Sequence, residues 1–210
     1  DHILGWRAPT YLYTVKGCEK IKALLRHYRL SDDVGYRFSA KWWTEHPLTA
    51  DKYARWLSAL GGDCVNIFMD YETFGEHHWA DTGIFEFLKA MPGEVIKNPA
   101  LRFSTPSELV DRIPARDYVD VPQVTSWADM ERDTSAWLGN EMQQNAFSLV
   151  ESLEQKVKGT KDSGLIRTWR MLQNSDHFYY MCTKSLSDQD VHNYFSPYDS
   201  PFDAYINYMN

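Results

Sequence analysis

The stretch DCVNIFMD, Asp63–Asp70, decides which fold the sequence predicts. Its middle is a short, nearly continuous apolar run, which is typical of a β-strand that is covered on both faces. The run ends abruptly at Asp70, and the next nine residues include two glutamates, two histidines and a tryptophan. So many titratable and aromatic groups at one strand end have three interpretations: a solvated loop, a metal site, or one half of a catalytic pair.

The segments around this stretch predict alternating helices and strands. Helical spacing or capping signals indicate four helices, at 16–30, 48–62, 82–91 and 106–113. Thr49 is the expected N-cap of the second helix, and Pro92 and Gly93 end the third. Thr105 and Glu108 form the expected capping box of the fourth. Residues 32–40, where Val34, Tyr36 and Phe38 alternate, and residues 100–104 read as further strands. This order is typical of parallel strands with crossover helices, as in part of an α/β barrel or, as the alternative, an open doubly wound sheet. Fewer strands are visible than the roughly eight of a closed barrel.

The second half of the chain reads as a different kind of structure. Residues 1–115 form the predicted α/β part, and residues 116–210 form a helical region expected to pack over it. Apolar residues recur at helical spacing from Leu138 to Val157, with Glu154 and Lys158 set for an i,i+4 ion pair. A helical pattern continues through residues 163–181, and a proline-marked turn precedes a last helix that ends the chain.

Composition excludes several classes of function. The formal charge is −7, from 29 acidic residues against 22 lysines and arginines, and no basic stripe is present, which disfavours nucleic-acid binding. No apolar stretch is long enough for a membrane span. The 3 cysteines are widely spaced, which favours reduced thiols and a cytoplasmic protein. Aromatic residues make up 15% of the chain, and many lie beside charges and prolines, which leans towards a sugar-binding or small-molecule surface.

Asp70 is the leading candidate for a catalytic residue. In parallel α/β folds the carboxyl ends of strands face a shared cleft, although a strand-ending aspartate often only caps the following turn. A metal site could use Asp70, Glu72, Glu76 and a histidine, but adjacent histidines in an extended segment point apart, and neither an H-E-x-x-H helix nor a cysteine pair is present. General acid/base chemistry by a carboxyl group, with a second carboxylate opposite and aromatic rings for a sugar face, is the favoured interpretation.

A second candidate, Asp176, lies far away in sequence. Helical spacing places it on one face with Leu165, Trp169, Leu172 and Tyr180, where an acid is costly without a partner. The alternative is that Ser175 or Asp176 caps a new helix that begins there. Among lesser candidates Arg37 is the strongest, because it follows the strand predicted at 32–40; Trp6, Arg7, Tyr11, Trp42 and Trp43 taken singly favour structural roles.

Four segments together resemble glycoside hydrolase family 57, the α-amylase-like enzymes. They are LGWRAPTYLY (4–13), LSDDVGYRFSAKWW (30–43), DYETFGEHHW (70–79) and LQNSDHFYYM (172–181). The resemblance implies part of an incomplete (β/α)7 barrel followed by a helical segment. It also implies that Asp70 is the general acid/base, and that helices after the barrel bring Asp176 to the substrate.

The implied activity is retaining hydrolysis of, or transglycosylation on, α-1,4-glucans. The residues expected to bind a glucan or maltooligosaccharide are Arg37, Trp42, Glu72, His77, His78, Trp79, Asp176 and His177, and neither a metal nor an organic cofactor is expected. Family members carry the nucleophilic glutamate on an earlier strand, and no residue here corresponds to it. We therefore interpret the chain as the C-terminal part of a catalytic unit, inactive by itself, whose open sheet edge is covered by the N-terminal part or by another copy. The alternatives are a non-catalytic α-glucan-binding or interaction module, and a metal hydrolase.

Overall fold

The computed structural model describes residues 3–128, 131–184 and 196–210. The chain forms two compact units that divide after Asp120, and each unit has its own hydrophobic core. Unit 1 mixes helices with a small sheet, whereas unit 2 is helical in all its described elements. Among the described residues, no helix combines the length and the apolar character that crossing a membrane requires.

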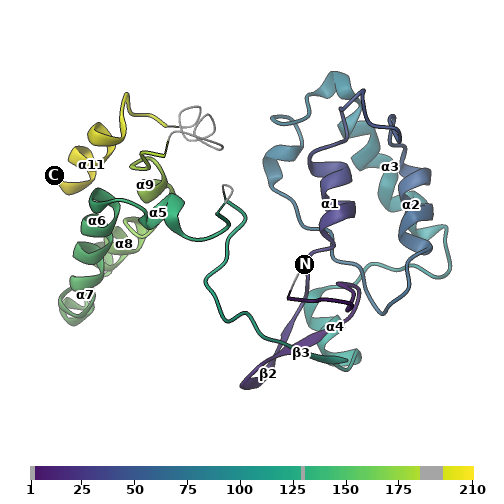
Figure 1. Cartoon of the computed structure of the whole chain (residues 1–210), viewed down its shortest axis with the longest axis horizontal. Helices are drawn as coiled ribbons and strands as arrows, with labels where there is room; N and C mark the ends of the chain where they lie inside the picture. Colours follow the sequence, from purple (N-terminus) through teal and green to yellow (C-terminus); the bar gives the residue numbers. More distant parts are fainter. Residues whose placement is uncertain (1–2, 129–130, 185–195) are drawn as a thin grey trace. The chain divides into compact units, whose positions relative to one another are not determined.

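A three-stranded sheet lies at one end of unit 1 (Figure 1). Strand β1 (Tyr13–Val15) is central, pairing antiparallel with β2 (Cys18–Ala23) and parallel with β3 (Asp117–Val119). Arg7 stabilises the junction of this sheet, because its guanidinium lies 3.1 Å from the Asp117 carboxylate and 5.6 Å from the centroid of the Tyr13 ring. Arg7 therefore has the structural role that the sequence favours.

Four helices make up most of the rest of unit 1: α1 (Tyr28–Gly35), α2 (Ala50–Ser58), α3 (Ile84–Ile96) and α4 (Pro106–Arg112). The core between α1, α2 and α3 includes Leu30, Val34, Tyr53, Ile84 and Phe87. The predicted helices at 48–62 and 106–113 are confirmed. Thr105 and Glu108 form the expected capping box, and Thr49 occupies the N-cap of α2 without a capping side-chain bond.

The helix predicted at 16–30 is wrong. Val15 pairs with Cys18 across a tight turn, and Gly17 takes a φ of +78°, a conformation that glycine adopts without a steric penalty. The chain therefore reverses at once into β2, and α1 does not begin until Tyr28, with the His27 side chain accepting a capping hydrogen bond.

The strand predicted at 32–40 is also wrong. Val34 and Phe38 are buried, but Tyr36 between them is 70% exposed, so the three do not share one face. Val34 lies four residues after Leu30, and these two buried side chains follow helical spacing instead. The alternation of apolar residues at 34, 36 and 38 indicated the wrong period.

Residues Asp63–Asp70 are extended but belong to no sheet. One edge of this segment is bonded to residues 25–31, with a single parallel bridge between Arg26 and Asn66. On the other edge, the main-chain groups of Val65, Ile67 and Met69 make no hydrogen bond to any described residue. The segment is thus half of a strand pairing, with one edge open.

The described residues contain no series of parallel strands joined by crossover helices. Residues 100–104 form no strand there, because nothing pairs with them, and Phe103 is 58% exposed. Helix α3 continues past Pro92 to Ile96, and the burial of Val95 one turn beyond favours this continuation over the stop that the proline predicts. The structure supports a mixed α/β class and does not display a barrel.

Unit 2 is built from short helices. They are α5 (Ser135–Leu138), α6 (Glu141–Ser152), α7 (Glu154–Thr160), α8 (Ser163–Met171), α9 (Ser175–Tyr179) and α11 (Pro201–Met209). Their core includes Ala146, Val150, Trp169, Phe178 and Met181.

The long helix predicted from Leu138 to Val157 is divided into three. Asn140 caps α6 in a capping box with Gln143, and this cap separates α6 from α5. The expected Glu154–Lys158 ion pair forms on α7. Gln143 is completely buried, and its side chain holds three helices together. It accepts hydrogen bonds from the amides of Gly139 and Asn140 and donates to the carbonyls of Ala136 and Phe178.

Candidate active site

Asp70 stands at the end of the extended segment 63–70, and buried polar groups fix the segment's bonded edge. The Asn66 carbonyl accepts from the His27 amide at 2.9 Å, and the Asn66 side chain donates to the carbonyl of Leu25 at 3.0 Å. The Phe68 amide donates to the Ser31 hydroxyl at 3.2 Å, and Ser31 is completely buried. These bonds set the direction in which the chain delivers Asp70.

Arg26 adds a charged clamp to the same edge. Its Nε donates to the Phe68 carbonyl at 2.8 Å, and its Nη2 lies 2.6 Å from the carboxylate of Asp32 on α1. Sequence reasoning overlooked Ser31 and Asn66 as positioning groups. For Asn66 the available signal was a polar residue inside an apolar run, since buried polar side chains are retained where they are hydrogen-bonded, whereas no such signal marks Ser31.

After Asp70 the chain folds into a compact loop, residues 70–79, closed by its own backbone. The carbonyl of Asp70 accepts from the Thr73 amide at 3.2 Å, which starts the short 3-10 turn η1 (Tyr71–Thr73). The Gly75 amide donates to the carbonyl of His78 at 3.0 Å, and the His78 amide donates to the carbonyl of Thr73 at 3.2 Å. Gly75 has a φ of +117°, a conformation in which glycine is far less strained than other residues.

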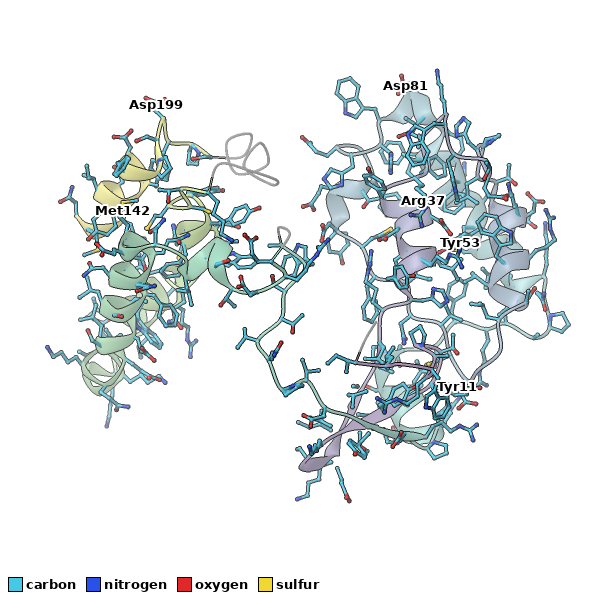
Figure 2. All side chains as sticks on the ribbon, in the orientation of Figure 1. Tyr11, Arg37, Tyr53, Asp81, Met142 and Asp199 are labelled. Atoms are coloured by element: carbon cyan, nitrogen blue, oxygen red, sulfur yellow. The ribbon has the colours of Figure 1, made fainter. Side chains whose placement is uncertain are left out.

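The loop separates its side chains into an outer and an inner set. The outer set is exposed and consists of Asp70, Tyr71, Glu72, Glu76, His77 and Trp79. Trp79 is 68% exposed and its indole N–H donates to the Glu76 carbonyl at 2.9 Å, which fixes the ring beside the acids. Figure 2 shows Asp81, two residues after Trp79, at the end of unit 1 opposite Tyr11 and the sheet. An acid, an imidazole and an aromatic face are thus presented to solvent together.

The inner set consists of Thr73 and His78. His78 is 3% exposed, and its Nδ1 lies 2.9 Å from the hydroxyl of Ser39. Burial lowers the pKa of His78, an effect partly offset by the nearby carbonyls of Gly35 and Val34, although Nε2 makes no hydrogen bond in the structure. His78 was predicted to contact substrate, but its ring lies behind the loop and not on the exposed face.

A hollow of about 1010 Å³ lies beside Asp70 within unit 1. Residues 60–71 border it along one side and residues 100–104 along another, and α3 contributes Leu88 and Met91. Most of the lining side chains are apolar, and the open edge of Val65, Ile67 and Met69 belongs to the same lining. The lining is suited to apolar side chains or to a further extended segment more than to a hydrophilic ligand.

The two remaining candidates in unit 1 differ in their environments. Arg37 is occupied by the protein: its Nη2 lies 2.7 Å from the Asp33 carboxylate, and its guanidinium lies 5.7 Å from the centroid of the Trp43 ring. Figure 2 shows Arg37 among the helices of unit 1. Trp42, in contrast, is 72% exposed and is available to stack on a ligand.

Asp176 and His177 lie in unit 2, on α9. The helical face that joined Asp176 to Leu165 is interrupted, because a new helix begins after Asn174, whose side chain accepts from the Asp176 amide. The N-cap is Asn174 and neither Ser175 nor Asp176. Asp176 is exposed in the first turn, and the His177 ring lies 5.3 Å from the ring of Tyr208. Asp176 therefore lies at the surface of unit 2 and not on a buried stripe.

Metal ligation finds little support in the described parts of the chain. No group of three or more histidine, cysteine, aspartate or glutamate side chains among those residues converges as a metal site would require. The described side chain of His78 instead contacts Ser39, and that of His77 is exposed.

Comparison with known proteins identifies the family. The sequence profile described as Glycosyl hydrolase family 57 matches residues 1–122, which hold all of β1–β3, α1–α4 and the loop that carries Asp70. The chain belongs to glycosyl hydrolase family 57. The resemblance to this family is thereby confirmed, and residues 4–13, 30–43 and 70–79 lie within the match, whereas residues 172–181 lie outside it.

A curated relative supports the same membership. The protein named "Putative alpha-amylase" from Methanocaldococcus jannaschii is 50% identical over 220 residues, an alignment that covers 100% of this chain and 47% of the relative. The chain thus spans about half the length of that relative. No solved structure matches the chain.

Proposed function

We propose that this chain is part of a retaining glycoside hydrolase that acts on α-1,4-glucans, and that Asp70 is its general acid/base. The observation that carries the proposal is the set of exposed side chains on the loop 70–79, in a family-57 segment, which includes the carboxyl group of Asp70, the imidazole of His77 and the indole of Trp79. The name of the M. jannaschii relative supports an amylase-type substrate. These side chains supply what glycosidic cleavage requires: a proton donor for the leaving oxygen, hydrogen bonds for hydroxyls, and a ring that stacks on a sugar.

In this mechanism Asp70 protonates the glycosidic oxygen as the bond to the anomeric carbon breaks, and it later deprotonates the incoming water or sugar acceptor. Glu72, His77, Trp79 and Trp42 bind the sugar through hydroxyl groups and ring faces. A retaining mechanism also needs a nucleophilic carboxylate about 5–5.5 Å from the acid. We assign that nucleophile to the part of family members that this chain does not match, and the length of the relative is consistent with this assignment.

We further propose that unit 1 is part of an incomplete (β/α)7 barrel, and that unit 2 is a helical region which packs over the cleft and contributes Asp176 and His177. The extended segment 63–70 supports the first point, because it is bonded along one edge and open along the other, beside an apolar hollow. A barrel strand pairs on both edges. Further strands of the complete enzyme would fill the hollow and bond to Val65, Ile67 and Met69.

Substitution of Asp70 in the full-length protein that carries this chain tests the proposal. With a maltooligosaccharide as substrate, Asp70→Asn should reduce kcat by about 10³-fold or more and leave the KM within about threefold, because the amide keeps the shape but cannot transfer the proton. Asp81→Asn, an exposed acid close in sequence, is the matched control and should retain activity. Turnover by Asp70→Asn within tenfold of the wild type would exclude Asp70 as the acid/base.

The second candidate function is a non-catalytic α-glucan-binding module. It is favoured by the exposed Trp42 and Trp79 on a chain that contains no counterpart of the family nucleophile. Assays of the 210-residue chain by itself show what it does without the rest of the full-length protein. We expect it to bind maltooligosaccharides weakly and not to hydrolyse them. Hydrolysis by this chain alone would contradict the assignment of the nucleophile to another part of the protein.

A further inference from the structure

The loop 70–79 rests on the end of α1 and on the segment that follows it, through the side chains of Thr73 and His78. Thr73 is 1% exposed and packs near Gly35, where an added Cβ would lie 3.8 Å from the Thr73 hydroxyl. His78 is the second contact, through its Nδ1 and the hydroxyl of Ser39 at 2.9 Å. The side chains of Thr73 and His78 are buried and that of Ser39 is half-buried, in contrast to the exposed ones that the proposed function uses.

Two backbone hydrogen bonds connect His78 with Asp70. The His78 amide donates to the carbonyl of Thr73, and the Thr73 amide donates to the carbonyl of Asp70, each at 3.2 Å. The Gly75 amide returns to the His78 carbonyl at 3.0 Å and closes the loop. These bonds connect the backbone that carries the His78 ring, by way of Thr73, to the backbone of Asp70.

The surroundings of the His78 ring exclude direct contact with a sugar in this conformation. The ring packs against Phe38, with 5.7 Å between the ring centroids, and little of the side chain is accessible. A sugar hydroxyl would have to displace the loop to reach it. His77, the adjacent histidine, faces solvent instead.

We propose that His78, held by Ser39, is a positioning residue that fixes the loop carrying Asp70, and that it is not a ligand of the sugar. This inference rests on the proposed function, because it assigns a role relative to the Asp70 acid/base. It divides the histidine pair, so that His77 faces the substrate and His78 anchors the loop to the protein.

Amide hydrogen exchange in the 210-residue chain tests the anchoring without any activity measurement. The amides of Gly75 and His78 report loop closure. In Ser39→Ala and in His78→Leu we expect both amides to exchange at least about tenfold faster, while amides of α2 keep wild-type rates. His77→Leu is the matched control for exchange and should leave both rates unchanged. Wild-type exchange at Gly75 and His78 in Ser39→Ala would overturn the proposal, even if His78→Leu fails to fold.

A conservative replacement separates positioning from simple packing. The amide of His78→Asn places a nitrogen close to where Nδ1 lies, so it can restore the bond to Ser39 with less bulk than leucine. We expect loop amides at least about threefold slower to exchange in His78→Asn than in His78→Leu. Equal rates in the two variants would overturn the assignment to the hydrogen bond.

The activity of Asp70→Asn in the full-length protein keeps this inference apart from the proposed function. If Asp70→Asn retains turnover while Ser39→Ala accelerates exchange, the proposed function fails and the anchoring stands. If Asp70→Asn loses turnover but exchange is unaffected by Ser39→Ala, the anchoring fails and the proposed function stands.

Discussion

Gly62 controls how the chain enters the segment that carries Asp70. It follows α2, has a φ of +130°, and lies so close to Thr10 that an added Cβ would stand 2.3 Å from the Thr10 hydroxyl and 2.6 Å from the Thr10 carbonyl oxygen. The same carbonyl accepts from the amides of Asp63 and Cys64. Both the backbone angle and the missing side chain are therefore required at this position.

Replacement of Gly62 by alanine should destabilise unit 1 by at least about 2 kcal/mol, because the strained angle and the contact with Thr10 are both unfavourable. Gly61→Ala is the matched control, since an added Cβ at Gly61 meets no atom within 4 Å and its φ is not positive. Urea unfolding of the two variants gives the comparison. Similar stabilities would show that the turn relaxes without cost.

The buried His78 predicts how the loop 70–79 responds to pH. Burial lowers the pKa of His78 from its ordinary value of 6.5, so the closed loop favours the neutral ring. When the loop opens, the ring is solvated and binds a proton more readily. Closure is therefore fully favoured above pH 6.5 and weakens as the pH falls from 6.5 towards the lowered pKa.

NMR titration of the imidazole signals checks this expectation, with exchange of the Gly75 amide corrected for its intrinsic pH dependence. Loop protection that stays constant from pH 7.5 to about 5 would contradict the pKa shift.

The sequence placed both histidines at the candidate site. Which of them turns inward depends on Ser39 and Phe38, and the local spacing of residues does not encode that choice.

At the scale of elements, the sequence predicts structure well where the signal is local. The capping box of α4 is formed by residues three positions apart, and α2 follows from one apolar face and its two terminal glycines. The segment 16–30 was predicted as a helix because its apolar residues fit that period. Its conformation is decided by pairing with β1 across the turn at Gly17, and the spacing of apolar residues carries no information about that pairing.

Gln143 is the clearest element-scale test in unit 2. Gln143→Leu keeps the volume but leaves two part-buried amides and two buried carbonyls without this partner, which should destabilise unit 2 by about 2–4 kcal/mol. Gln144→Leu is the control, because Gln144 is exposed and makes a single bond of 3.2 Å to the Leu138 carbonyl. Chemical unfolding followed on α6 and α9 amides distinguishes them. A cost below 1 kcal/mol for Gln143→Leu would mean that the three helices pack without this side chain.

At the scale of the whole molecule, the family could be identified from short motifs, but the architecture could not be derived in full. The motif at 70–79 placed Asp70 at a strand end, and the structure shows an extended segment there with one bonded edge. A parallel sheet depends on strands far apart in the chain, so the three predicted strands do not establish which edges are paired. The same limit applies to Asp176, whose proposed role depends on how two separate units meet.

The open edge of Val65, Ile67 and Met69 also has a consequence for the chain in solution. Unpaired strand edges beside apolar surface act as templates for a neighbouring strand. Produced alone, the chain should self-associate as its concentration rises, as sedimentation velocity can measure. Ile67→Pro should suppress this association, because it removes a main-chain donor that is free in the monomer and leaves the bonds of Asn66 and Phe68 intact. The strand edge next to Asp70 would then determine how the chain behaves in solution as well as how its strands pair.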